Sequence, residues 1–302
     1  MTAASREIIL TVRCLTYNQA PFVRQCLDGI VMQRTDFGFV ALVHDDASTD
    51  GTAEIIAEYA ARYPEIIHPV LEKENLYSKH DGSLSKVILS HCTGKYVAYI
   101  EGDDYWTDPL KLQKEVDFLE NNPEYGLVRT HFDRYYQKEG KIEKGIFPAM
   151  YGMTDTHQGY ILNPVFAGPC TWVFRMKYQR NRPAYDRTRY FGGDLALLLE
   201  ISRSSKVKCL EENTAVYRIL GDSASHTESP QRSLNFLIKL KNTRILFAKS
   251  QPLSFRVKLW IRICRSYRDK YRKAGKYHEW FTMCVSDFVE LFIRRKDKVL
   301  DI

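Results

Sequence analysis

The sequence lacks the cysteine patterns that would mark a zinc or disulfide protein. Its seven cysteines are odd in number and scattered, and no C-x-x-C pair occurs. This usage favours a reducing compartment, where thiols stay free. The sequence also lacks an apolar run long enough to span a bilayer, and it shows no charged leader followed by a long apolar core. We therefore expect a cytoplasmic protein without a membrane anchor.

Internal repeats and low-complexity tracts are absent as well, and the bulk composition is ordinary. Hydrophobic residues make up 44% and charged residues 27%, as in a typical globular protein. The net charge of +7 hides an asymmetry, because residues 232–302 carry 18 Lys and Arg against 6 Asp and Glu, whereas residues 1–231 carry 26 against 31. This asymmetry predicts two parts with different partners: a main domain at 1–229 and a basic helical extension at 230–302.

Strand-like and helix-like segments alternate through the first third of the chain. The expected strands are Ile8–Leu15, Phe39–His44, Ile66–Leu71 and Lys95–Ile100, and the helices between them are 21–31, Thr52–Arg62 and Ser83–His91. Pro21 suits the first turn of the first helix, and Asp50 is the expected N-cap of the second. Strands separated by helices of this length predict an α/β fold with a mainly parallel central sheet and flanking helices.

The second half is less regular and becomes helical toward its end. Expected elements are a helix at Pro109–Glu120, a hairpin of Leu127–Tyr136 and Lys141–Phe147, strands at Thr171–Arg175, Val207–Leu210 and Thr214–Ile219, and helices at Asp194–Ser202 and Phe281–Ile293. Between the last two helices, an apolar stripe flanked by arginines consists of Leu253, Val257, Trp260, Cys264, Tyr267 and Tyr271. This segment either rests on an anionic membrane surface or packs against the main domain with its basic side chains solvated.

Two short acidic clusters each follow an apolar, strand-like run. Asp45 and Asp46 come after the second expected strand, and Asp103 and Asp104 come after the fourth. Ligands collect beyond the carboxyl ends of strands in an open α/β sheet, so the two clusters are candidates for one site. Adjacent carboxylates suit Mg²⁺ or Mn²⁺, whose shells are often completed by substrate phosphates and water. One such acidic cluster by itself would indicate a solvated turn before a helix. The presence of two clusters, each after a strand, favours a binding site.

Five sequence pieces, in this order, resemble glycosyltransferase family 2. They are Leu15-Thr16-Tyr17-Asn18, Asp45–Thr52, Glu101-Gly102-Asp103-Asp104, Gly193–Glu200 and Ala215-Val216-Tyr217-Arg218. The resemblance covers roughly residues 6–226 and implies the GT-A fold of nucleotide-diphospho-sugar transferases, with the helical extension after it. One stretch, Tyr77–Lys86, departs from the family pattern, and there Lys79, His80 and Lys86 are the candidates for a phosphate or base contact.

The resemblance implies roles for particular positions. Asp194 would be the catalytic base, although without the family it would simply be a helix N-cap. Asp104 would hold the metal, Mn²⁺ or Mg²⁺, and Trp106 would stack on the donor or acceptor sugar. His226 would contact metal or phosphate, unless it is an ordinary histidine of a surface loop. The candidates for donor binding are Thr16, Tyr17, Asn18, Asp45, Asp46, Lys79 and Asp103.

The function that the resemblance implies is a metal-dependent inverting glycosyltransferase, hexosyl- or N-acetylhexosaminyl-transferring. It would move a sugar from a nucleoside-diphosphate donor, a UDP-sugar, to a hydroxyl of a glycan or lipid-linked acceptor in cell-surface polysaccharide biosynthesis. If the basic extension binds membrane, the enzyme would work at the inner face of the cell membrane. The alternatives are a sugar-nucleotide pyrophosphorylase, which normally has a glycine-rich loop that residues 16–20 lack, and a non-catalytic donor-binding subunit of a glycan assembly complex. Nucleic acid is not an expected partner, because the acidic clusters have no basic groove beside them.

Overall fold

The computed structural model describes residues 7–147, 150, 154–163, 168–181, 183, 185–186, 188–191, 193–221 and 229–293. The chain divides into two compact units. Unit 1 comprises residues 1–147, 167–182 and 205–218, and unit 2 comprises residues 148–166, 183–204 and 219–302. In this division by packing, two central segments of the chain belong with the C-terminal helices. A boundary between a transferase domain and a helical extension at residue 229 stays a prediction.

Unit 1 is built on one mixed sheet. Its strands are β1 (Ile8–Thr16), β2 (Gly38–Asp45), β3 (Ile67–Leu71), β4 (Tyr96–Glu101), β5 (Tyr105–Trp106), β6 (Tyr125–Tyr136), β7 (Lys141–Ile146), β8 (Val173–Arg175) and β9 (Lys206–Ile219). The order across the sheet is β3-β2-β1-β4-β8-β6-β9-β5, with β7 paired to β6. β1 to β4 pair in parallel, whereas β4–β8, β6–β8, β6–β7 and β5–β9 are antiparallel pairs. The predicted α/β class and the β6–β7 hairpin are confirmed.

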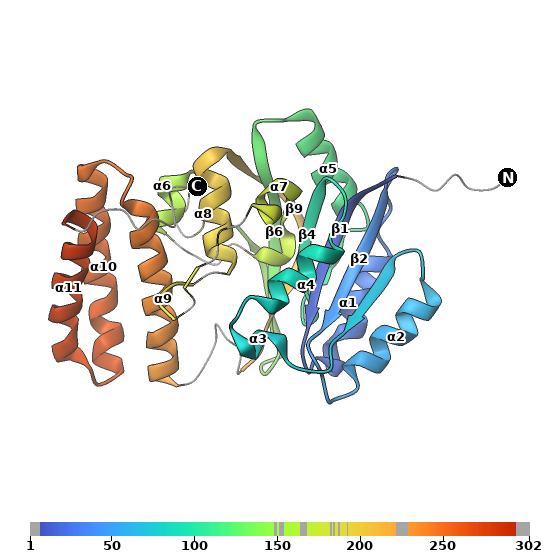
Figure 1. The fold of residues 1–302 in the computed structure, drawn as a ribbon, viewed down its shortest axis with the longest axis horizontal. Helices are drawn as coiled ribbons and strands as arrows, with labels where there is room; N and C mark the ends of the chain where they lie inside the picture. The colour runs from blue at the N-terminus through green and yellow to red at the C-terminus, as the bar shows by residue number, and fades with distance from the viewer. Residues whose placement is uncertain are drawn as a thin grey trace. The chain divides into compact units, whose positions relative to one another are not determined.

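Helices flank the parallel strands (Figure 1). In unit 1 they are α1 (Ala20–Val31), α2 (Thr52–Arg62), α3 (Leu76–Lys79), α4 (Ser83–His91), α5 (Lys111–Asn121) and α7 (Met176–Arg180), with a 3-10 helix at Pro169–Thr171. α1 and α2 contact each other, and α4 packs against β2. Val23, Cys26 and Ile30 of α1 are fully buried, so the apolar face of this helix is what attaches it to the sheet.

Several local expectations were wrong, and three of them concern α2, α5 and β9. The N-cap of α2 is Gly51, at φ 98°, while the Asp50 carboxylate accepts the Thr52 amide hydrogen from one residue earlier. α5 begins at Lys111, because the residues from Pro109 form a turn first. β9 is one continuous strand where two were expected, since the polar stretch 211–213 is solvent-exposed without interrupting it.

The four parallel strands end at the same edge of the sheet. Thr16 of β1 lies beside Asp45 of β2, and Leu71 of β3 is also in register with Asp45. Glu101 of β4 lies beside Leu15 of β1. The acidic residues that follow β2 and β4 therefore emerge at one edge, as the sequence predicts.

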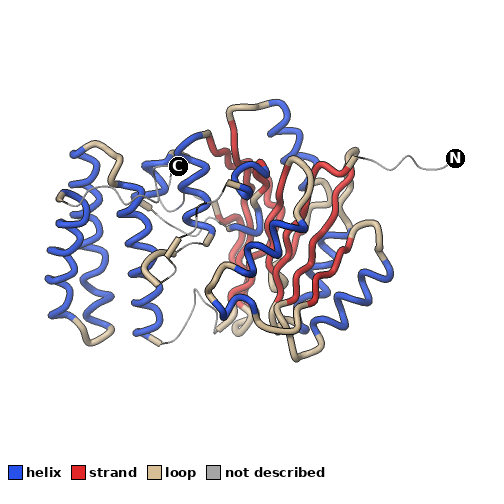
Figure 2. Tube along the Cα trace, viewed as in Figure 1, coloured by secondary structure: helices blue, strands red, loops and turns tan. Residues whose placement is uncertain are grey.

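The described elements of unit 2 are helices (Figure 2). They are α6 (His157–Leu162), α8 (Asp194–Ser204), α9 (Pro230–Ala248), α10 (Leu253–Lys273) and α11 (Tyr277–Phe292). α10 contacts both α9 and α11. Over the stretches that the structure describes, none of the helices has the length and apolar character needed to cross a membrane.

The aromatic residues of the predicted apolar stripe on α10 pack inside unit 2. Tyr267 is buried, and its hydroxyl donates to the Leu237 carbonyl of α9 at 2.7 Å. The Trp260 indole donates to the Cys284 carbonyl of α11 at 2.9 Å. Hydrogen bonds to neighbouring helices hold both side chains within the packing of unit 2. Contact of the extension with a membrane stays a prediction.

Candidate functional site

The first candidate residues lie where β1 and β2 end. The Asp45 carboxylate accepts hydrogen bonds from the Thr16 hydroxyl at 2.9 Å and from the Ser48 hydroxyl and amide at 2.6 and 2.9 Å. Asp45 and Thr16 are both buried. These donors satisfy the buried carboxylate. The side chains of Asp45 and Thr16 are therefore held in one position at this edge of the sheet.

Asp46 fastens the segment that follows β3. Its carboxylate oxygens accept the backbone amides of Leu76 and Tyr77 at 2.7 and 3.0 Å, at the start of the short helix α3. Lys79 ends this helix and pairs with Glu74 at 2.7 Å, yet the lysine side chain is 41% exposed. A ligand phosphate could replace such an exposed partner at small cost. Asp46 and Lys79 are thus brought to one loop at the sheet edge.

The loop after β1 is tied to the loop after β2. Asn18, at φ 50°, accepts the Thr49 amide on its side-chain oxygen at 2.9 Å, and its own amide donates to the Ser48 hydroxyl at 2.8 Å. Tyr17, next to it, is 51% exposed. The cross-links hold the loops still, and the exposed tyrosine ring is available for stacking.

Asp103 and Asp104 follow β4 in a buried turn. Asp104 is 3% exposed, and its Oδ1 accepts the Arg218 amide at 2.9 Å. Burial raises the pKa of Asp104 well above its usual value, and the charges of Asp103 and Glu101 raise it further. Burial also raises the pKa of Asp103. A cation would favour ionisation here, because it offsets both the lost hydration and the mutual repulsion.

Arg218, from β9, closes this turn. Its Nε donates to the Asp103 carbonyl at 2.8 Å, and its terminal nitrogens donate to the side-chain oxygens of Gln137 and Gln25 at 2.5 and 2.7 Å. Three aromatic rings surround its guanidinium carbon at 4.8–5.5 Å, those of Phe22, Tyr135 and Tyr105. The sequence motif that ends in Arg218 pointed only to the family. The contact of Arg218 with the acidic turn could not be predicted from that motif, because it depends on the pairing of β9 with β5 in the fold.

The donor set at the turn suits a hard divalent cation. Asp103 and Asp104 supply adjacent carboxylates. Among the described residues, no three histidine, cysteine, aspartate or glutamate side chains gather as a ready-made metal site. A metal here would therefore use one or two carboxylates, with substrate phosphates and water as its other ligands. His226, the other predicted metal contact, lies outside the described residues.

Trp106, predicted to stack on a sugar, lies in the core instead. It is 2% exposed, and its indole nitrogen donates to the Cys170 carbonyl at 2.7 Å. The Lys111 ammonium lies 4.9 Å from the ring centroid, and Gly29 of α1 packs against the Trp106 backbone. The ring is covered because β5 pairs with β9 and turns the side chain inward. This corrects the prediction, which rested only on nearness to Asp104 in the sequence.

Asp194 is the first residue of α8, in unit 2. Its side chain is half-buried, and its Oδ1 accepts the Leu195 amide at 2.8 Å. A carboxylate at a helix N-terminus is favoured by the helix dipole. The observed geometry is that of a helix start, and a catalytic role for Asp194 stays a prediction.

Comparison with known protein families finds a match over more than half of the chain. Residues 12–182 match the family model described as glycosyl transferase family 2. The uncharacterized protein Rv1520 of Mycobacterium tuberculosis is 36% identical over 211 residues, which are 69% of this chain and 58% of that protein. The chain thus spans less than two thirds of the length of this relative.

Solved structures of similar fold include two with bound nucleotide. TarS 1–349 of S. aureus in complex with UDP aligns with a TM-score of 0.63 and 16% identity, over 95% of this chain and 81% of that one. The mannosyltransferase PcManGT of Pyrobaculum calidifontis, in complex with GDP-Man and Mn²⁺, aligns with a TM-score of 0.57 and 17% identity, over 96% and 88%. At these identities the likeness shows the fold, which is the GT-A fold.

Proposed function

The chain belongs to glycosyl transferase family 2, and we propose that it is a metal-dependent inverting transferase that takes its sugar from a UDP-sugar. The observation that carries this proposal is the buried Asp103-Asp104 turn at the end of β4, where burial raises both carboxyl pKa values. Such a turn lies where ligands bind in open α/β sheets, and it gains from a cation. The TarS complex with UDP and the PcManGT complex with Mn²⁺ support the same assignment.

The edge formed by β1, β2 and α3 would bind the nucleotide. The exposed ring of Tyr17 can stack on the base, and Thr16 and Asp46 keep acceptor lone pairs beyond the hydrogen bonds that hold them. Lys79 can turn from Glu74 to a phosphate. Asp103 would face the ribose or the donor sugar.

The reaction would be one displacement at the anomeric carbon. Asp104, with Asp103 beside it, would hold the metal, which supplies positive charge against the departing diphosphate. Asp194 would accept the proton of an acceptor hydroxyl while that oxygen bonds to the anomeric carbon and the bond to the diphosphate oxygen breaks. The transferred sugar would be a hexose or an N-acetylhexosamine. The acceptor would be a glycan or lipid-linked hydroxyl in cell-surface polysaccharide biosynthesis.

Calorimetric titration with UDP, with and without Mn²⁺, tests the nucleotide and metal site. We expect Mn²⁺ to strengthen UDP binding to the wild type and to have no such effect on Asp104→Ala, because that variant loses the proposed metal ligand. Asp117→Ala is the matched control, since it removes an exposed carboxylate of α5. If the wild type bound UDP equally well with and without Mn²⁺, Asp104 would not act as a metal ligand in UDP binding. Absence of UDP binding under both conditions would contradict the proposed donor.

A second prediction concerns Gly102, which lies where the acidic turn meets β1. A Cβ at this position would lie 2.5 Å from Gln19 Oε1 and 2.6 Å from Thr16 Cγ2. We expect Gly102→Ala to lower the free energy of unfolding by about 1–3 kcal/mol through overpacking, and to weaken UDP binding by displacing Thr16. Urea unfolding and UDP titration measure the two effects.

Gly140→Ala serves as the control for Gly102→Ala. Gly140 also lacks a side chain in a turn, but its Cβ would meet no atom within 4 Å, although its φ of +62° would strain an alanine. It should lose stability without any change in UDP affinity. Equal UDP binding by both variants would show that Gly102 is not needed for the shape of the site.

A further inference from the structure

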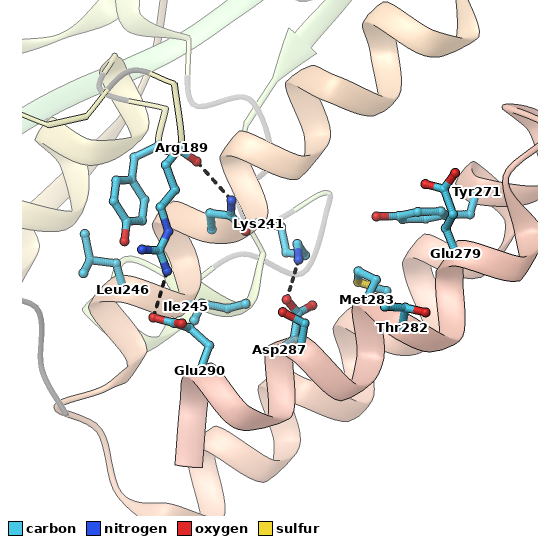
Figure 3. Close-up of a pocket in the computed structure, with 13 residues that line it drawn as sticks. Arg189, Lys241, Ile245, Leu246, Tyr271, Glu279, Thr282, Met283, Asp287 and Glu290 are labelled. Atoms are coloured by element: carbon cyan, nitrogen blue, oxygen red, sulfur yellow. Dashed lines mark hydrogen bonds and ion pairs between the residues drawn. The ribbon is translucent and has the colours of Figure 1, made fainter. Parts of the chain in front are cut away.

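Unit 2 contains a cleft that the proposed reaction does not use (Figure 3). It lies between α9 and α11 and has a volume of about 410 Å³. Ile245 and Leu246 of α9 and Met283 of α11 give it an apolar lining, joined by the rings of Tyr190 and Tyr271. This volume is near the lower end of the range for small-molecule sites, about 300–1,000 Å³, and therefore suits a ligand of one or two rings.

The charged side chains that line the cleft are all paired. The pairs are Lys241–Asp287 at 2.5 Å, Arg189–Glu290 at 3.0 Å and Lys276–Glu279 at 3.7 Å. The side chains of Lys241 and Asp287 are 5% and 6% exposed, so separating them would strand a charge in the interior. An anionic ligand would have to displace a carboxylate from Lys241 or Arg189, and a cationic ligand at Asp287 would lie beside the positive charge of Lys241. The cleft therefore favours a neutral ligand.

Hydrogen-bonding atoms remain available in the cleft in spite of this pairing. Asp287 is 4% exposed, and its Oδ2 has no hydrogen-bond partner among the described residues, while Oδ1 accepts from Lys241. This oxygen can accept a hydrogen bond from a ligand or from water. The Asn242 amide nitrogen donates to the Arg189 carbonyl at 3.0 Å, and the amide oxygen is a further acceptor.

The rim of the cleft adds two hydroxyl groups, those of Thr282 and Ser286 on the exposed side of α11. The cleft thus combines charges that have ion-pair partners, two aromatic residues and an apolar lining with acceptors and hydroxyls. A ligand that fits must be uncharged, must offer several hydroxyl donors and must have an apolar face. These are the properties of a pyranose ring, which has hydroxyl groups around a ring with apolar C–H faces.

We propose that this cleft binds one neutral sugar residue, either free or as part of a glycan chain. One hydroxyl of the sugar would donate to Asp287 Oδ2, and others would bond to Asn242 and to the rim. The inference does not depend on the donor site of unit 1. It would give the protein a second carbohydrate contact, separate from the nucleotide-sugar.

Saturation-transfer NMR on the full chain tests this inference. The probes are the methyl glycosides of glucose, galactose, mannose and N-acetylglucosamine, with glucuronate and glucosamine as charged counterparts. We expect at least one neutral glycoside to bind saturably, and the charged counterparts to bind at least ~10-fold more weakly because they disturb an ion pair. A charged sugar that bound as well as the neutral ones would contradict the charge argument.

Two tryptophan substitutions on α11 test whether the glycoside detected by NMR binds in this cleft. Ser286→Trp places a large ring at the rim and should abolish binding, whereas Val285→Trp, at a position that is 49% exposed and outside the cleft lining, should leave it intact. Thr282→Trp repeats the block if Ser286→Trp does not fold. Binding that survives both blocking variants, or no saturable binding of any neutral glycoside, would overturn the proposal.

Oligosaccharides of the bound sugar show whether the natural ligand is a free sugar or one residue of a glycan chain. Tighter binding with increasing chain length would identify a glycan, and unchanged or weaker binding would identify a free sugar. UDP titration with Mn²⁺ on the same Ser286→Trp sample separates this inference from the proposed transferase activity. Loss of sugar binding with normal UDP binding is the expected pair of results.

Discussion

Replacement of Asp194 by asparagine is expected to lower the rate of sugar transfer by ~10²–10⁴-fold while UDP binding with Mn²⁺ stays unchanged. That range is what a positioned general base typically contributes. Asparagine has nearly the same shape and caps a helix about as well as aspartate, so α8 should still begin at the same residue. The substitution removes the ability to accept a proton, and it also removes a negative charge from the helix N-terminus, which costs little stability at an otherwise unchanged helix start. Transfer from a UDP-sugar to an acceptor, followed as UDP release, measures the rate.

Asp186→Asn provides the comparison for Asp194→Asn. Asp186 also lies in unit 2, and its Oδ1 accepts the Thr188 amide and hydroxyl at 2.9 and 2.6 Å, a local turn with no proposed catalytic role. We expect this variant to retain nearly full activity. If Asp194→Asn also transferred sugar at the wild-type rate with normal unfolding behaviour, Asp194 would be a helix-start residue and the base would have to be sought elsewhere.

The parallel part of the sheet was predictable because its signals are local. The apolar runs of β2 and β4 are short and continuous, and each is followed at once by acidic residues that end the strand. Parallel strands place their carboxyl ends at one edge, so the meeting of Asp45 with Thr16 followed from order and direction alone. The helix of residues 83–91 was also confirmed, since its boundaries carry their own glycine signals.

The remaining parts of the site depend on contacts between distant residues. Arg218 donates to Asp104 across 114 positions, and nothing near either residue in the sequence indicates that bond. Trp106 was misassigned for the same reason, because its burial is decided by β9 and the Cys170 carbonyl. α3 has only four residues, too few for a periodic pattern, yet it supplies the amides that hold Asp46. Distant pairing of this kind is visible only in the fold.

Replacement of Lys111 by methionine is expected to lower the free energy of unfolding by about 3–5 kcal/mol. The side chains of Lys111 and Glu115 form an ion pair that is 0% exposed, directly beneath Trp106. Lys111 also donates to the Thr171 carbonyl at 3.2 Å. Removal of the lysine leaves Glu115 buried without its counter-charge. Urea unfolding at pH 8, where Glu115 of the folded wild type is ionised, followed by circular dichroism measures the loss.

Two further variants isolate the buried pair. Lys114→Met removes a neighbouring lysine that is 38% exposed and pairs with Asp108, so it should cost no more than about 1 kcal/mol. The double variant Lys111→Met with Glu115→Leu should recover most of the stability, because no buried charge remains. If Lys111→Met cost as little as Lys114→Met, the pair would not be the support beneath Trp106 that the contacts indicate.

The buried pair of Lys111 and Glu115 should also make the stability of the protein depend on pH. Burial raises the pKa of Glu115 to about 7 in the folded protein, from an ordinary value of 4.5. The folded state therefore binds more protons than the unfolded state between these two values, and this contribution to stability is lost as the pH rises through about 7. We expect wild-type stability to fall relative to that of the double variant between pH 5 and pH 8, by up to about 3 kcal/mol. Because Trp106 follows Asp104 by two residues, a weakened support at high pH would also loosen the turn that is proposed to hold the metal. Rising pH ionises Asp103 and Asp104 in both proteins, so we expect the difference between them to report on the support: the UDP affinity of the wild type with Mn²⁺, relative to that of the double variant, should be lower at pH 8 than at pH 5.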